Sequence, residues 1–197
     1  LSPEEMAQLP GYGPDMKARI AEAKKLLAEA GYPGGFETTQ VARSDIADYI
    51  RNAEFVNSSL EPLGIKVKVV VMESGAWYAA MAKRAIDMAS LSVAVSLDDP
   101  DPLLGTFVIT EAGRPYAGYS NPEVDKLYAE QTRLLDFKER KKVVDKLHKL
   151  ALQEVPYAMY GMLGRILVTW AEVKNIQHPA GSMSHIASNL QEVWIAR

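Results

Sequence analysis

Three aspartates and two prolines stand together in the segment Asp98–Pro102. Paired carboxylates can act as a general acid and base, or they can hold a hard cation such as Ca²⁺. Aspartates beside prolines also cap turns and helix starts, because their side chains accept hydrogen bonds from nearby backbone amides. The spacing does not fit a calcium-binding loop, since the glycine that such a loop needs at its sixth position is Leu103 here. Acid–base chemistry and turn capping both stay open.

The chain offers few other groups for metal or nucleophilic chemistry. It has no cysteine, which excludes a disulfide framework, a thiol nucleophile and a cysteine metal site. His148 falls in the middle of a lysine-rich helical pattern and is expected at the surface. His178 and His185 are seven residues apart in a loop-like stretch, unlike the close helical spacing of a zinc protease. We therefore predict no metal and no cofactor, and keep a metal-dependent hydrolase using Asp98, Asp99 and His185 as an alternative.

Several aromatic and cationic side chains could bind a ligand. Four aromatic residues could clamp it, or could pack in the core: Trp77, Tyr78, Tyr116 and Tyr119. Arg43 and Arg114 lie in predicted loops, where they could neutralise an anionic ligand or be solvated. No phosphate-cradling GxxxxGK[ST] loop, no GxGxxG after a strand and no GxSxG elbow is present. The common nucleotide-binding and serine-hydrolase classes are therefore not favoured.

The composition is that of one globular domain with a substantial core. The 197 residues are 48% hydrophobic and 24% charged. A net charge of −3 gives no electrostatic footprint for nucleic acid. No uninterrupted apolar run reaches the roughly 18 residues of a membrane-spanning helix.

Hydrophobic spacing predicts alternating helices and strands in the first half of the chain. We expect helices over 15–30, from Ser44 or Asp45 to Leu63, and over 74–84, with strands over 36–41, 65–71 and 86–95. The last strand is nearly all apolar or small, which suits a central position in the sheet. Helical crossovers require parallel strands, so the loops around 42–44, 72–74 and 96–99 should share one edge of the sheet. That edge is the predicted ligand face.

The second half reads as a helical pair followed by further strands. Ser120 or Asn121 should cap a helix that runs to Leu134. A second helix is expected over 137–154, with its charged run Lys138–Lys142 on a solvated face. Strand-forming residues follow at 157–163, 166–170 and 193–195.

Four segments in this order resemble the family 5 extracellular solute-binding proteins, the dipeptide, oligopeptide and nickel receptors of ABC importers. They are AKKLLAEAGYPGGF at 23–36, LEPLGIKV at 60–67, DDPDP at 98–102 and YSNPEVDKL at 119–127. The resemblance implies an α/β fold, namely the distal lobe of a type II periplasmic binding protein with a mostly parallel sheet flanked by helices. Residues 1–172 would form this ligand-binding lobe, incomplete at its amino end, and residues 173–197 would be a tail that packs on an amino-terminal lobe.

The resemblance also implies a function without bond chemistry. The chain would be part of a monomeric receptor that captures a peptide or other small organic solute between two lobes and delivers it to a membrane permease. The receptor would be periplasmic, or lipid-anchored outside a Gram-positive cell. We expect ligand contacts from the central loop and from three further side chains, namely Ser96, Leu97 and Asp98, then Arg43, Trp77 and Tyr119.

One part of the family pattern is missing. Peptide-binding members carry a Trp and, three residues later, an Asp that pairs with the ligand's α-amino group. Those positions are Val93 and Ser96 here. A buried ammonium needs a paired charge, so a zwitterionic peptide is disfavoured unless Asp98 or Asp99 substitutes. A sugar, an opine or another small organic solute becomes more plausible, and a metal or metal-chelate receptor using His185 is the alternative within the family.

Overall fold

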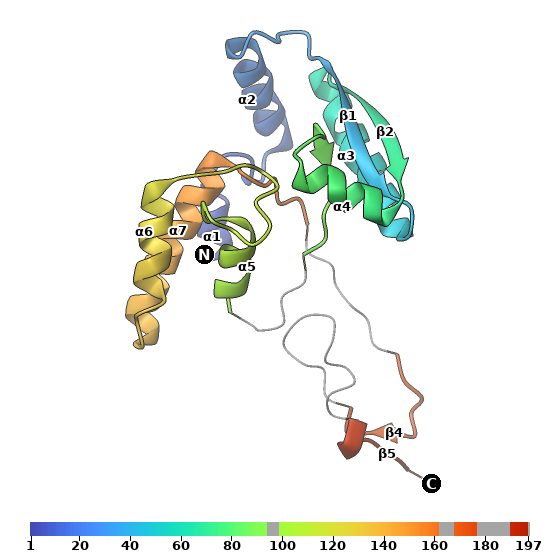
Figure 1. Ribbon diagram of the computed structural model, residues 1–197, viewed down its shortest axis with the longest axis vertical. Coiled ribbons are helices and arrows are strands. Elements are labelled where there is room, and N and C mark those ends of the chain that lie inside the picture. Colours follow the sequence, from blue (N-terminus) through green and yellow to red (C-terminus); the bar gives the residue numbers. More distant parts are fainter. Residues whose placement is uncertain (94–98, 162–167, 177–189, 197) are drawn as a thin grey trace.

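The structure, a computed structural model, describes residues 1–93, 99–161, 168–176 and 190–196 (Figure 1). The chain opens with a short helix α1 (Pro3–Met6), in which the Ser2 side chain accepts from the N–H of Glu5. Helix α2 (Met16–Glu29) begins where predicted, because Asp15 accepts hydrogen bonds from the N–H groups of Lys17 and Ala18 at 2.9 and 3.1 Å. The amphipathic helix over 15–30 is thus confirmed.

A parallel three-stranded sheet forms the centre of the first half. Its strands are β1 (Glu37–Arg43), β2 (Lys66–Met72) and β3 (Met88–Ala89), in the order β2-β1-β3. The parallel arrangement confirms the prediction, but the central position was wrongly assigned to 86–95. Strand β1 is central because it pairs with both neighbours, and only Met88 and Ala89 of the predicted third strand pair with it. Residues 94–95 lie outside the described residues.

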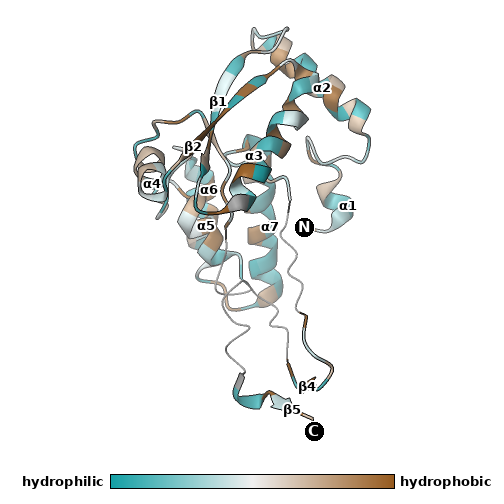
Figure 2. Cartoon of the chain, turned by 90° about the vertical axis from the view of Figure 1, so that its right-hand side faces the viewer, coloured by the Kyte–Doolittle hydropathy of each residue, from teal (hydrophilic) through white to brown (hydrophobic). Residues whose placement is uncertain are grey.

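The helices α3 (Ala47–Leu60) and α4 (Ser74–Ala82) connect these strands, with a 3-10 turn η1 (Glu61–Leu63) after α3. Figure 2 shows α3 and α4 on opposite sides of β1 and β2, as right-handed crossovers require. Neither Ser44 nor Asp45 caps α3, contrary to the prediction. The N-cap is Ile46, because the Asp45 carboxylate is bound to Arg43 instead.

A helical unit forms the other half. It contains α5 (Asp101–Phe107), α6 (Pro122–Gln131) and α7 (Phe137–Glu154). Asn121 caps α6 as predicted, but α6 ends at Gln131 rather than at Leu134. The α5–α7 core cluster is built from apolar residues of all three helices and of the C-cap of α5: Leu104, Phe107, Val108, Val124, Leu127, Leu147 and Ala151. Leu91 and Tyr116 pack against both this cluster and the core of the sheet, so they join the two halves.

The last described residues form a small antiparallel pair, β4 (Val173–Lys174) with β5 (Trp194–Ile195), next to the 3-10 turn η2 (Leu190–Glu192). Both views show this pair apart from the helices and the three-stranded sheet (Figures 1 and 2). Strand β5 confirms the prediction at 193–195. The strands expected at 157–163 and 166–170 are absent from 157–161 and 168–170, the parts of them that are described. Tyr157 packs instead against the α5–α7 core cluster.

None of the helices within the described ranges is long and apolar enough to cross a membrane.

Candidate functional site

The carboxyl ends of the three parallel strands meet at one edge of the sheet, as predicted. The N–H of Ser44, after β1, donates to the carbonyl of Met72 at the end of β2, at 2.9 Å. The N–H of Ser92, after β3, donates to the hydroxyl of Tyr49 at 3.3 Å. We call this edge the carboxyl rim. The predicted contacts Ser96, Leu97 and Asp98 lie outside the described residues.

A buried cation lies at the carboxyl rim. Arg43 ends β1 and is only 8% exposed. Its Nε and Nη2 donate to the two carboxylate oxygens of Asp45 at 3.0 and 2.6 Å, and its Nη1 donates to the hydroxyl of Tyr78 at 2.8 Å. The guanidinium also lies 5.0–5.8 Å from the ring centres of Tyr49, Trp77 and Tyr78. Arg43, Asp45 and the three rings are the Arg43 cluster.

The electrostatics of the Arg43 cluster keep both groups charged. The hydrogen bonds that Arg43 donates to Asp45 raise the pKa of Arg43, and the same contact lowers the pKa of Asp45. Cation–π contacts with the rings stabilise the guanidinium where it has little water. The cluster is therefore a fixed positive group with an attached carboxylate, at the edge where α/β proteins bind ligands.

Trp77 does not reach the surface, which corrects its prediction as a ligand contact. Its side chain is 0% exposed, and its indole Nε1 lies 3.5 Å from the carbonyl oxygen of Val41, to which it donates. A large apolar ring is most stable when it is fully buried, and the ring supports Arg43 from the core side. The next residue, Tyr78, is 37% exposed and lies beside Arg43. Trp77 and Tyr78 are adjacent on one helix, so their side chains point in different directions. This adjacency was the sequence signal that the two rings would not both be in the core.

Tyr119 belongs to a different set of contacts. Its hydroxyl donates to the carboxylate of Glu154, which also accepts from the side-chain amide of Asn121 at 2.8 and 2.9 Å. Burial and the nearby Glu154 raise the pKa of Tyr119. These bonds join the start of α6 to the end of α7. Among the described residues, no hydrogen bond connects Tyr119 to the Arg43 cluster.

In the acidic segment 98–102, Asp99 and Asp101 are both hydrogen-bonded to other parts of the fold. Asp99 accepts hydrogen bonds from both terminal nitrogens of Arg140, and from the N–H of Asp101 at 2.8 Å. Asp101 accepts from the side-chain amide of the fully buried Gln131 at 2.6 Å. The bond from Arg140 lowers the pKa of Asp99. The structure therefore favours turn capping as the role of Asp99. Arg140 is partly buried beside Asp99, although residues 138–142 were expected on a solvated face.

The remaining candidate residues give little support for a binding or catalytic site. His148 is partly buried, and burial lowers its pKa, so it is not the surface residue expected. Tyr116 packs against both core clusters, while Arg114 is exposed. His178 and His185 lie outside the described residues. No group of three potential metal ligands occurs among the residues that the structure describes, so the hydrolase and metal-chelate alternatives gain no support there.

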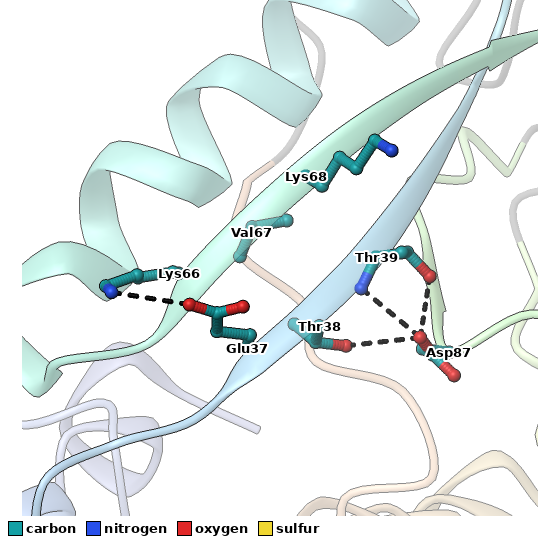
Figure 3. A pocket seen from close by; sticks show the side chains of 7 residues that line it. All are labelled: Glu37, Thr38, Thr39, Lys66, Val67, Lys68 and Asp87. Carbon is teal, nitrogen blue, oxygen red and sulfur yellow. Dashed lines mark hydrogen bonds and ion pairs between the residues drawn. The ribbon is translucent and has the colours of Figure 1, made fainter.

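An open groove of about 440 Å³ lies at the opposite edge of the sheet, at the amino ends of β1 and β2 (Figure 3). Its lining is mostly polar and comes from Glu37, Thr38, Thr39, Lys66, Val67, Lys68 and Asp87. Asp87 accepts hydrogen bonds from both threonines, and Glu37 pairs with Lys66 at 3.3 Å. These polar groups largely satisfy one another, so the carboxyl rim stays the better candidate.

A parallel α/β fold with a charged cluster at the carboxyl ends of its strands has the arrangement in which α/β proteins bind small ligands. The chain belongs to the bacterial extracellular solute-binding proteins, family 5, because the middle region of that family matches residues 2–114. The family predicted from the four sequence segments is therefore confirmed.

Curated relatives agree with this family. The chain is 29% identical over 129 residues to the glutathione-binding protein GsiB of Pectobacterium atrosepticum, covering 61% of this chain and 25% of the relative. It is also 29% identical over 144 residues to heme-binding protein A of Haemophilus influenzae, covering 69% and 26%. The chain thus spans about a quarter of the length of the curated relatives it matches.

Solved structures share the fold. The periplasmic binding protein DppA from Helicobacter pylori, in complex with the peptide STSA, matches with a TM-score of 0.65 and 30% identity, over 74% of this chain and 28% of that one. The binding protein AgaA of A. tumefacien R10, in complex with agropinic acid, matches with a TM-score of 0.57 and 29% identity, over 76% and 32%. The predicted fold class, a lobe of a type II periplasmic binding protein, is confirmed.

Proposed function

We propose that this chain is the distal ligand-binding lobe of the substrate-binding component of an ABC importer. The receptor captures a small organic solute between two lobes and delivers it to a membrane permease, without making or breaking bonds. It acts as a monomer in the periplasm, or on the outer surface of a Gram-positive cell. The observation that carries this proposal is the Arg43 cluster at the carboxyl rim of a family 5 chain.

Capture follows from contacts on both lobes. A solute that touches both walls of the cleft binds the closed state better than the open state, so it shifts the population toward closure. The distal wall is proposed to consist of the Arg43 cluster and the central-loop residues Ser96, Leu97 and Asp98. One lobe alone offers only part of these contacts and should bind weakly.

The chemistry of this wall favours a solute with a carboxylate. Arg43 is a buried, preorganised guanidinium, which binds carboxylates with two parallel hydrogen bonds. Ser96 offers no charge for an ammonium group at the position where peptide-binding members carry an Asp. An acidic solute without a free α-amino group fits both features. A neighbour whose title names agropinic acid supports a small acidic ligand, while glutathione, named for another relative, has carboxylates but also a free α-amino group.

The tail at 173–197 is proposed to pack on the amino-terminal lobe of the receptor. Large apolar side chains are exposed on and beside β4 and β5: Val168, Trp170, Trp194 and Ile195. Trp170 is 82% exposed, which is unusual for a residue of this size. Exposed apolar patches of this kind mark interaction sites.

Native mass spectrometry of the full receptor, purified from its export compartment, tests the function. We expect a bound organic mass with at least one carboxylate, and we expect Arg43→Gln to lose it. Arg51→Gln is the matched control, because the Arg51 side chain is 75% exposed and pairs with Asp48 at 3.2 Å. Equal retention by Arg43→Gln and wild type would contradict the site, and a peptide mass would mean that another group replaces the missing Asp.

Ser96→Trp tests the central loop separately. A bulky ring at a cleft position should abolish solute retention while the melting temperature of the empty receptor stays unchanged. Unchanged retention with an intact fold would remove Ser96 from the site.

A further inference from the structure

We propose that Asp45 is an internal competing anion, which occupies the Arg43 guanidinium until the carboxylate of a solute displaces it. This inference rests on the proposed function, because it makes Asp45 the residue that sets how strongly an acidic solute must bind. Asp45 is thus a specificity-determining residue that no motif in the sequence marks.

Arg43 is positioned to stay in place during such an exchange. Its side chain is 10% exposed, and three aromatic rings surround its guanidinium. The hydroxyl of Tyr78 accepts from Nη1 independently of Asp45. Tyr49 is in turn bonded to the N–H of Ser92. The cation is therefore fixed by contacts that persist when its carboxylate partner leaves.

Asp45 is positioned to leave. Its side chain is 44% exposed, and it lies in the bend between β1 and α3 rather than inside either element. It makes no capping bond to α3. Among the described residues, the only side chain to which its carboxylate is hydrogen-bonded is Arg43. Moving it away therefore breaks one ion pair and no backbone structure.

A second carboxylate nearby does not pair with Arg43. Glu73 follows β2; hydrogen bonds from the N–H groups of Gly75 and Ala76 lower its pKa, and the charge of Asp45 acts on it weakly in the opposite direction. Those N–H groups hold the Oε2 of Glu73 at the start of α4, at 2.7 and 3.2 Å, and among the described residues Glu73 makes no hydrogen bond to Arg43. The site thus has one fixed anion and one exchangeable anion.

The geometry of the pair defines the chemical class of the incoming group. Asp45 uses the edge of the guanidinium formed by Nε and Nη2, at 3.0 and 2.6 Å. A solute carboxylate can occupy the same edge with the same two hydrogen bonds. A hydroxyl or an amide offers only one acceptor oxygen in that plane. A neutral solute would therefore replace the two hydrogen bonds of Asp45 with one, and it would bring no negative charge. The exchange therefore selects for acids.

Acetate is the smallest probe of this site, and the Nε–H resonance of Arg43 in the NMR spectrum reports on it directly. Acetate is titrated against the 197-residue chain at constant ionic strength, with chloride as the balancing anion. If Asp45 occupies Arg43 in about nine of ten molecules, Asp45→Asn should strengthen acetate binding about tenfold. Asp48→Asn is the matched control and should leave the affinity unchanged, since Asp48 pairs with the exposed Arg51.

The outcomes separate this inference from the proposed function. Equal acetate affinity in wild type and Asp45→Asn overturns the inference but leaves Arg43 as an anion site. No acetate-dependent shift of Arg43 in any variant overturns both. Asp45→Ala provides a second variant in case asparagine keeps a hydrogen bond to Arg43, and backbone amide spectra check that each variant is folded.

Discussion

The guanidinium of Arg140 donates to both carboxylate oxygens of Asp99, at 2.6 and 2.7 Å, although the two residues are 41 positions apart in the chain. This pair joins Asp99, two residues before α5, to the first turn of α7. It also connects to the buried Gln131, which accepts from Nε of Arg140 at 2.9 Å. Two helices and the end of the acidic segment are therefore fixed to one another by a small set of charged and polar groups.

Asp99→Asn should lower the free energy of unfolding by about 1–3 kcal/mol, because charge-assisted hydrogen bonds at a partly buried site are lost. Urea unfolding monitored by circular dichroism measures this. Glu139→Gln is the control, since Glu139 pairs with Lys142 at an exposed position and should change stability by less than about 1 kcal/mol. Equal effects of the two substitutions would show that the Asp99 pair is no more than a surface contact.

The same pair predicts a pH dependence. Arg140 lowers the pKa of Asp99 in the folded protein, so the stabilisation is fully present above the unfolded pKa of about 3.9 and is lost as the pH falls through the folded value. The stability difference between wild type and Asp99→Asn should therefore shrink below about pH 4. Urea unfolding at pH 6 and pH 2.5 measures that difference. A difference that stays constant across this range would rule out the charged pair as its source.

Gly35 and Gly64 approach each other where α2 leads into β1 and η1 leads into β2. Gly35 has φ +82°, and a Cβ there would lie 2.1 Å from the carbonyl oxygen of Gly64. Gly35→Ala should cost at least about 2 kcal/mol, since an unfavourable backbone conformation adds to a collision with backbone atoms. Gly34→Ala should be nearly neutral, because nothing lies within 4 Å of its Cβ position. Thermal and urea unfolding of both variants check the contrast, which similar losses would refute.

Trp77→Ala should destabilise the protein by about 3–5 kcal/mol, because it opens a cavity beneath Arg43. Trp170→Ala is the matched control and should change the stability of this chain by less than about 0.5 kcal/mol, since Trp170 is 82% exposed. Urea unfolding measures both. A loss below about 1 kcal/mol for Trp77→Ala would mean that the core collapses into the space, contrary to the close packing of Trp77 with Tyr78 at 4.9 Å between ring centres.

The sequence by itself determined the elements whose signals are local. Asp15 and Asn121 cap helices because an N-cap side chain bonds to amides two or three residues away, a contact that depends on neighbours in the chain. Helical periodicity likewise fixed 137–154, and alternating strands and helices implied parallel pairing and a shared carboxyl rim. The four family segments were also readable without coordinates.

Only the tertiary structure decided which partner each side chain meets. The strand expected over 86–95 pairs at just Met88 and Ala89, because strand pairing depends on a distant segment and not on local apolar character. Trp77 and Tyr78 have similar ring chemistry, yet one is in the core and the other is at the rim, beside Arg43. Asp45 resembles a helix cap in sequence, but a buried guanidinium binds its carboxylate more strongly than the amides of α3 do. Such choices depend on burial and charge brought together by folding, which local sequence does not contain.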